Sequence, residues 1–85
     1  MTLRPKKGVD EIALRDFLVS IQPHVLRAKG IISVRCAGEN PTNMLVEIAG
    51  KEICLKKTDA EKTPFVIIGY EGEGLGKLVR SRWKF

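Results

Sequence analysis

The 85-residue chain has only two cysteines and one histidine, so few of its side chains could bind a soft metal ion or exchange protons near neutral pH. Cys36, Cys54 and His24 do not have the close spacing of a structural zinc site. None of the three serines lies in the glycine-flanked motif of an activated nucleophile. We therefore expect no catalytic residue, no metal site and no cofactor.

Long apolar runs are also missing. The uninterrupted apolar segments are a handful of residues long, whereas a membrane-spanning helix needs about 20. Residues 1–7 lack the apolar stretch of a signal peptide. These absences predict a cytoplasmic protein with no membrane contact and with reduced cysteines, which we interpret as small apolar residues of strands.

The composition that is present is that of a folded domain. Hydrophobic residues make up 44% of the chain and charged residues 29%, which is ordinary for globular proteins. The length predicts a single domain over residues 1–85, with one core and no room for a deep cavity beside a separate catalytic layer. An enzyme acting on a large substrate is therefore excluded.

The formal net charge of +5 arises at the two ends of the chain, while the segment between them is close to neutral. The terminal segments contain basic residues and no acidic ones: Arg4, Lys6, Lys7, Lys77, Arg80, Arg82 and Lys84. Such ends can attract an acidic partner, either a phosphate backbone or the acidic surface of a protein. They can also serve solubility alone.

Residues 10–22 are predicted to form an amphipathic helix, because their apolar residues recur at the i, i+3 and i+4 spacing. Asp10 or Gly8 is placed to cap the start of this helix. Its end is expected at Gln22, since Pro23 disfavours helical geometry in the residue before it.

The flanks of this helix have two further signals. Pro23 is expected to open a short turn that runs through Arg27 and is ended by Gly30. Residues 2–4 are predicted to form a short edge strand. The helix is thus expected to lie between a strand and a turn.

The middle of the chain changes to the pattern of strands. Alternating or β-branched runs, separated by turn residues, predict strands over residues 31–36, 44–49, 52–57 and 64–69. The second and third are joined by Gly50 and Lys51, which predicts a hairpin. The fourth run is almost entirely apolar, which suits the most buried place in the sheet.

The fold class follows from the order of these elements. Residues 75–83 have apolar residues at helical spacing, and residues 72–77 are interpreted as the turn before this helix, since they lack the full pattern of a phosphate-binding loop. The order is β-α-β-β-β-β-α, or α-β-β-β-β-α without the first strand. We predict an α+β domain with a mostly antiparallel sheet of four or five strands and two helices on one face.

The C-terminal segment interleaves basic and aromatic residues, which is the pattern of a surface that neutralises phosphates and stacks on bases: Lys77, Arg80, Arg82, Trp83, Lys84 and Phe85. The alternative is an amphipathic helix with Arg80 and Arg82 in solvent and Trp83 packed against the core. The sequence leaves both open.

Residues 25–32 contain Leu26-Arg27-Ala28-Lys29-Gly30, and residues 65–69 read Phe-Val-Ile-Ile-Gly before the last helix. This arrangement resembles the C-terminal domain of the CobW family of metal-handling GTPases, in which a helix runs into a Leu-Arg-x-Lys-Gly signature, strands follow, and an apolar Ile-Gly strand leads to the last helix. The resemblance covers roughly residues 9 to 82, judged from the shared order of elements.

The resemblance implies a role without GTP hydrolysis, since the chain has no P-loop and no Cys-x-Cys-Cys motif. It also implies that Arg27 and Lys29 face an acidic neighbour, while Gly30 ends a helix. The loop before Phe65 is shorter than is usual in the family, which alters the surface that the relatives share.

These observations predict a stand-alone, non-enzymatic module that binds a protein, for example a GTPase or a metal-trafficking protein, in cobalamin or metal-cofactor handling. The expected partner-binding residues are Arg27, Lys29, Arg80, Arg82 and Trp83. The alternative is a small basic nucleic-acid-binding domain that uses the C-terminal Arg/Lys/Trp cluster. A metal-site protein using Cys36, Cys54 and His24 is a third class, and a dimer formed through an exposed strand edge is left open.

Overall fold

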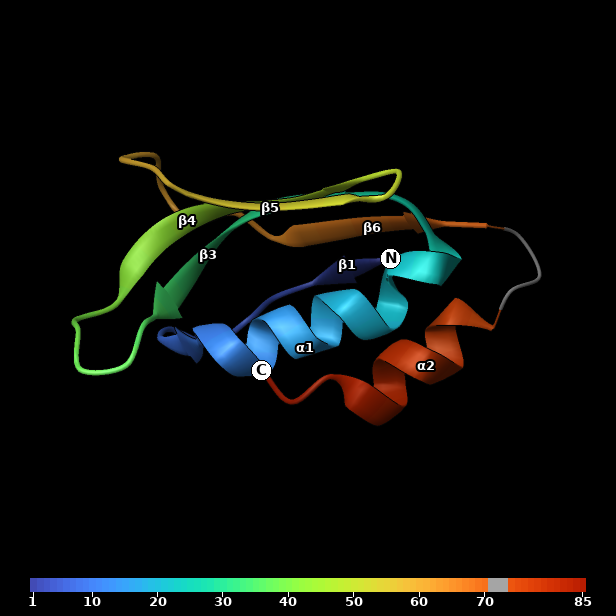
Figure 1. The fold of residues 1–85 in the computed structure, drawn as a ribbon, viewed down its shortest axis with the longest axis horizontal. Helices are drawn as coiled ribbons and strands as arrows, with labels where there is room; N and C mark the ends of the chain where they lie inside the picture. The colour runs from blue at the N-terminus through green and yellow to red at the C-terminus, as the bar shows by residue number, and fades with distance from the viewer. Residues whose placement is uncertain (71–73) are drawn as a thin grey trace.

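A computed structural model of the chain describes residues 1–70 and 74–85, and shows a curved sheet with two helices packed on one of its faces (Figure 1). The elements in chain order are β1 (Thr2–Leu3), β2 (Val9–Asp10), α1 (Glu11–Ile21), the short 3-10 helix η1 (Gln22–His24), β3 (Val25–Arg35), β4 (Thr42–Ala49), β5 (Glu52–Lys57), β6 (Phe65–Gly69) and α2 (Leu75–Arg82). This arrangement confirms the predicted α+β class and the position of both helices on one face.

Among the described residues the sheet has six strands, one more than the upper estimate from the sequence. Five of them lie in the order β1-β6-β3-β4-β5 with antiparallel neighbours, and the two-residue β2 pairs in parallel with the end of β3. The short edge strand expected at residues 2–4 is β1, and the predicted 52–57 strand is β5. The long central β3 joins the two halves of the sheet, since it pairs with both β4 and β6.

The first helix forms as its apolar periodicity predicts. The Asp10 carboxylate accepts a hydrogen bond from the Ala13 backbone N–H at 2.9 Å and so caps the start of α1. Leu14, Leu18 and Ile21 are fully buried on the side of α1 that faces the sheet. They pack with the inward side chains of the strands into one core.

The short turn expected at Pro23 forms, but its predicted extent through Arg27 and its end at Gly30 are wrong. The η1 helix ends at His24, and β3 then runs from Val25 to Arg35, with a register shift against β6 between Val25 and Arg27, so Gly30 lies in the middle of a strand. Pairing on both sides of β3 satisfies its backbone groups, and this tertiary context outweighs the local helical preference of residues 26–29.

Gly30 is needed for close approach rather than for ending a helix. The Thr63 N–H donates to the Ile31 carbonyl at 3.0 Å, which draws the segment before β6 onto β3. A Cβ atom on Gly30 would lie 2.7 Å from the Pro64 carbonyl oxygen and 2.8 Å from Phe65 Cα. Only glycine fits there without moving backbone.

The two ends of the chain are fixed next to each other. The Met1 ammonium donates to the Ile67 carbonyl at 2.9 Å, and Ile67 N–H donates back to Met1 at 2.8 Å, which extends the pairing of β1 with β6. The Lys6 N–H donates to the Phe85 carbonyl at 2.7 Å. The basic terminal segments, distant in sequence, are therefore neighbours in space.

The second helix begins at Leu75, as predicted, and ends one residue before Trp83. Val79 is buried, and Leu75, Leu78 and Trp83 pack partly buried against the core. The turn predicted for residues 72–77 falls in part on residues 71–73, which lie outside the described chain.

Candidate protein-binding face of the sheet

The alternation of β3 divides the Leu-Arg-x-Lys-Gly segment between the two faces of the sheet. Ala28 and Gly30 are buried beneath the helices, whereas Arg27 and Lys29 are exposed. Because successive side chains of a strand point to opposite faces, both cations project from the face that the helices leave uncovered. The segment is therefore part of the sheet surface, not the end of a helix.

Cross-strand pairing shows which side chains surround these cations. Arg27 lies opposite Ile68 of β6 and Ala49 of β4, and Lys29 lies opposite Val66 and Glu47. Two residues after Lys29 on β3, Ile31 lies opposite Leu45 of β4. We call this surface the open face, and its main side chains are Arg27, Lys29, Ile31, Leu45, Glu47, Cys54, Lys56, Val66 and Ile68.

The apolar run of β6 is only half buried, contrary to the prediction that this strand takes the most buried place in the sheet. Phe65 and Ile67 are buried under the helices, but Val66 is 43% exposed and Ile68 52% exposed on the open face. A strand that is apolar on both faces is typical of a sheet covered on both faces. Within the described residues, helices cover one of the two faces and leave the other exposed.

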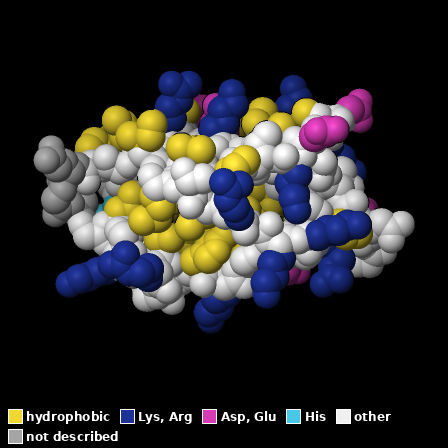
Figure 2. Space-filling view, turned by 180° about the vertical axis from the view of Figure 1, so that it is seen from behind, with side chains coloured by type: hydrophobic (Ala, Val, Ile, Leu, Met, Phe, Trp, Pro, Cys, Tyr) yellow, Lys and Arg dark blue, Asp and Glu magenta, His cyan; other side chains and the backbone are white. Residues whose placement is uncertain are grey.

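The open face is hollowed where β6 meets β3. A shallow depression of about 480 Å³ lies between Lys29, Ile31, Leu45, Pro64 and Val66. Figure 2 shows the molecule from behind, with the open face along the upper margin rather than toward the viewer, and on this side hydrophobic side chains gather between Lys and Arg side chains while few Asp or Glu are visible. Apolar contact area and positive charge are thus combined on the molecular surface.

Within residues 1–70 and 74–85, no carboxylate lies within 4.0 Å of the cations of the open face. Among residues 1–70 and 74–85, the one ion pair within 4.0 Å joins Arg15 to Glu11 of α1, at 3.7 Å. Lys29 is the cross-strand partner of Glu47, yet the two do not approach to that distance. The charges of Arg27 and Lys29 can therefore interact with carboxylates of another molecule.

The other predicted contact residues lie elsewhere. Arg80 and Arg82 are exposed on α2, which packs on the helix-covered side of the sheet (Figure 1). They therefore do not form one surface with Arg27 and Lys29. The five residues predicted as one contact set are divided between the two sides of the molecule.

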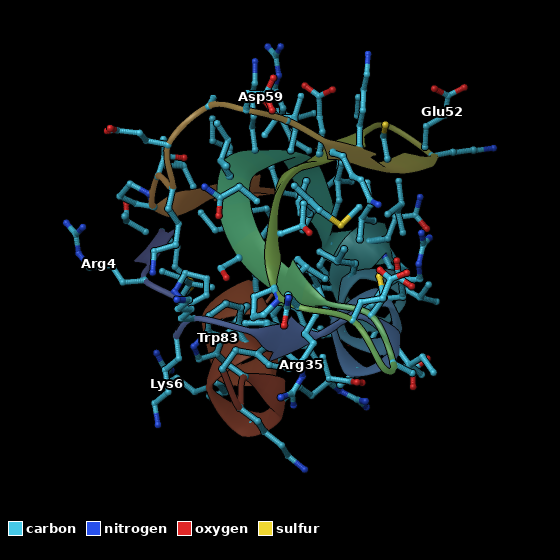
Figure 3. All side chains as sticks on the ribbon, turned by 90° about the vertical axis from the view of Figure 1, so that its left-hand side faces the viewer. Arg4, Lys6, Arg35, Glu52, Asp59 and Trp83 are labelled. Carbon is cyan, nitrogen blue, oxygen red and sulfur yellow. The ribbon has the colours of Figure 1, made fainter. Side chains whose placement is uncertain are left out.

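Trp83 packs into the molecule instead of projecting from it. Its ring meets Phe17 of α1 edge-on, with centroids 5.1 Å apart, and Phe85 edge-on at 5.2 Å. Phe85 also contacts Phe17 at 5.9 Å, so the three rings form a closed cluster between α1 and the C-terminal segment. Figure 3 shows Trp83 beside Lys6, where the two ends of the chain meet.

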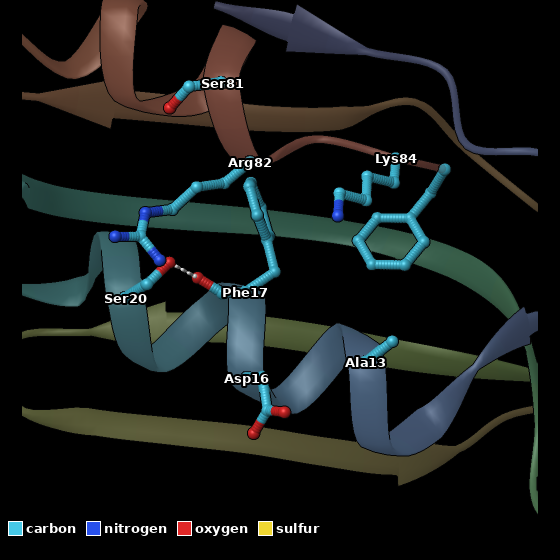
Figure 4. Close-up of a pocket in the computed structure, with 8 residues that line it drawn as sticks. Ala13, Asp16, Phe17, Ser20, Ser81, Arg82 and Lys84 are labelled. Atoms are coloured by element: carbon cyan, nitrogen blue, oxygen red, sulfur yellow. Dashed lines mark hydrogen bonds between the residues drawn. The ribbon is translucent and has the colours of Figure 1, made fainter.

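A second depression, of about 520 Å³, lies along this aromatic cluster between α1 and the chain end (Figure 4). Arg82 and Lys84 reach over it from the C-terminal side, and Asp16 lies on the α1 side. The Ser20 hydroxyl donates to the Phe17 carbonyl of its own helix at 2.7 Å and is thereby occupied. The depression thus has charged side chains of both signs around it.

The candidate metal ligands are not brought into one cluster. Cys54 lies opposite Glu47 in the β4–β5 hairpin, Cys36 follows the end of β3, and both are free thiols. Within the described residues there is no group of three or more His, Cys, Asp or Glu side chains that could hold a metal ion. Burial raises the pKa of the Cys36 thiol, and a hydrogen bond with Glu11 and its negative charge raise this pKa further.

The domain architecture is that of a small α+β module in which helices cover one face of an antiparallel sheet and leave a basic, apolar face open. The chain matches the family model described as "Cobalamin synthesis protein cobW C-terminal domain" over residues 1–80, so it belongs to this family. No curated protein and no solved structure matches it. No helix within the described residues is long and apolar enough to cross a membrane.

The sequence reading found the two cations of the open face but missed the apolar residues between them. The available signal was the uninterrupted run from Phe65 to Ile68, which has no polar residue on either side of the strand. In a chain with only two helices, both expected on one face, that run already required a second cover.

Proposed function

We propose that this chain is a non-enzymatic, cytoplasmic accessory module that binds a protein partner through the open face of its sheet. By its family, its place is in cobalamin or metal-cofactor handling. The partner is a GTPase or a metal-trafficking protein that presents apolar side chains flanked by carboxylates.

The observation that carries this proposal is the exposure of Val66 and Ile68 beside Arg27 and Lys29. These two neighbouring apolar side chains lie on an interior strand and are about half exposed. Their contact with water is unfavourable, so binding of a surface that covers them would be favourable. The neighbouring cations have no carboxylate within 4.0 Å in the described chain. They would orient an acidic partner and repel a basic one.

The nucleic-acid alternative has less support. Stacking on bases needs exposed aromatic rings, but Trp83 and Phe85 are packed against Phe17. The described strands present Val, Ile and Leu on the open face rather than aromatic rings. The basic ends of the chain could still attract the phosphates of a nucleic acid. Such binding predicts that the affinity for nucleic acid falls as the salt concentration rises.

A pulldown with the full chain, followed by titration of the recovered protein, tests the proposal. We expect a GTPase or a metal-trafficking protein to be recovered, and Arg27→Glu to weaken its capture. The double variant Arg27→Glu/Lys29→Glu should weaken it further, and Ile68→Ser should weaken it without changing charge. Capture that is unchanged in all three variants would contradict binding of the partner through the open face.

Two further assays separate the alternatives. Binding to single- and double-stranded probes at low salt would support the nucleic-acid function if the affinity falls by several log units per log unit of salt, and absence of binding would end it. Zinc or cobalt retained through purification would support the metal-site class. Metal-free protein with two titratable thiols would contradict that class.

A further inference from the structure

In the part of the chain that the structure describes, the sheet has one long edge strand with no neighbour on its outer side, which is β5. This strand ends the sheet order and spans Glu52–Lys57, whereas the opposite edge is the two-residue β1. In an antiparallel ladder the N–H and C=O groups of successive residues point alternately to the two sides, so half of those in β5 face outward. Figure 3 shows Glu52 at the outer margin of the sheet. Such an edge is a template for another strand.

We infer that two copies of this chain pair antiparallel through β5, with Cys54 opposite Cys54 of the second copy. Both sheets then continue as one, with their helices on the same side. This pairing requires that residues facing each other lie on the same face of the joined sheet. On β5 the open face has Glu52, Cys54 and Lys56, and the helix-covered face has Ile53 and Leu55.

This register is self-complementary on both faces. Glu52 of each copy lies opposite Lys56 of the other, which forms two symmetric pairs of opposite charge. Ile53 lies opposite Leu55 of the second copy, again twice. Both side chains are only partly buried in the single chain, where they pack against the edge of the core. The second copy would complete their burial.

Neighbouring registers lose these matches. A shift of the pairing by one residue would place open-face side chains opposite helix-covered ones. A shift by two residues in one direction puts Glu52 opposite Cys54, and in the other direction it puts Lys57 opposite Ile53. The Glu52–Lys56 pairing is therefore the register that combines matched faces with opposite charges.

The expected assembly is a closed, weak dimer. A two-fold axis uses the β5 edge of both copies, and β1 is too short to continue the sheet, so the pairing does not grow into a fibre. Pairing along a single six-residue strand buries less than a standard interface, which limits its affinity. Lys51 and Lys57 meet as like charges at the two ends and weaken it further.

The decisive experiment uses the full chain with Cys36→Ser, so that Cys54 is the one thiol. Sedimentation from about 10 μM to about 1 mM should show a monomer–dimer equilibrium. Glu52→Lys and Lys56→Glu should each weaken association about tenfold, because each replaces two attractive pairs by two repulsive ones. The double variant Glu52→Lys/Lys56→Glu should restore association, because it again has two pairs of opposite charge, with the acidic and basic positions exchanged.

A second readout reports on the register. With added diamide as oxidant, the Cys54 thiols should form an intermolecular disulfide, faster in the parent and the double variant than in either single variant. Circular dichroism checks that the variants stay folded, which the exposure of both side chains predicts. A monomer at every concentration, or a double variant that associates no better than the single variants, would overturn the proposal. Neither result decides whether a protein partner binds at Arg27, Lys29, Val66 and Ile68, because that binding is measured separately.

Discussion

The two faces of the sheet are built from the same strands but have different environments. On the helix-covered face, alternate residues of β3, β4 and β6 are excluded from water and form one core with α1 and Val79. On the open face, the intervening residues include aliphatic side chains of the same kind, yet Val66 and Ile68 are about half exposed. The comparison teaches that the first face holds the fold together, while the second is available for contact with another molecule.

The sharpest way to test this difference is a pair of identical substitutions at adjacent positions of β6. Ile67 is 1% exposed and Ile68 is 52% exposed. Ile67→Ala leaves a cavity in the core and should cost about 2–5 kcal/mol in the free energy of unfolding. Ile68→Ala should cost less than about 1 kcal/mol. Urea unfolding measures both, and equal costs would contradict the description of the open face.

Glycines provide a second matched pair. Gly30→Ala should destabilise the domain by about 1–3 kcal/mol, because its Cβ meets the backbone of Pro64 and Phe65. Gly76→Ala in α2 should instead stabilise it by up to about 1 kcal/mol, since the nearest atoms there are the flexible ends of Arg80 and Met1. Thermal melts of the two variants should shift in opposite directions. A neutral Gly30→Ala would disprove the close approach.

A substitution in the aromatic cluster tests whether Trp83 serves packing or stacks on the bases of a nucleic acid. Trp83→Ala should lower the free energy of unfolding by about 1–2 kcal/mol, since the half-buried ring loses its edge-on contacts with Phe17 and Phe85. In the parent protein, the fluorescence of Trp83 should be blue-shifted in the folded state relative to the unfolded state. Unchanged stability together with lost affinity for single-stranded nucleic acid would favour the stacking surface instead.

The two thiols differ by environment and should react in a defined order. Cys54 is exposed, whereas Cys36 is partly buried and its thiol pKa is raised by burial and by Glu11. A raised pKa lowers the thiolate fraction at neutral pH, so Cys36 should be alkylated more slowly, and its rate should keep rising to higher pH. Peptide mapping after iodoacetamide treatment measures the order. Faster modification of Cys36 would contradict this assignment.

Much of the fold is predictable from the sequence, because its signals are local. The apolar stripe and Asp10 predict α1, and the alternating run with Gly50 predicts the β4–β5 hairpin, in which Gly50 adopts a φ of 61°. The start of β3 was missed because residues 27–30 have little strand propensity, although they alternate between the faces, and are extended by pairing with β4 and β6. Long-range pairing of this kind leaves no local signal.

The candidate site was predictable in part. Arg27 and Lys29 were identified through the family signature, but their placement on a sheet face required the register of three strands. Trp83 was grouped with them because sequence proximity to Arg80 and Arg82 suggests a shared surface. Only the tertiary contact with Phe17 shows that its ring points inward.

The central claim is that the open face, not the helix-covered side, binds the protein partner. It is tested most directly by comparing the partner's affinity for two double variants with the same change of charge, Arg27→Glu/Lys29→Glu on the open face and Arg80→Glu/Arg82→Glu on α2. We expect the first pair to weaken binding at least about tenfold and the second to leave it within about threefold of the parent. Equal losses in both pairs, or a larger loss in the α2 pair, would contradict the claim.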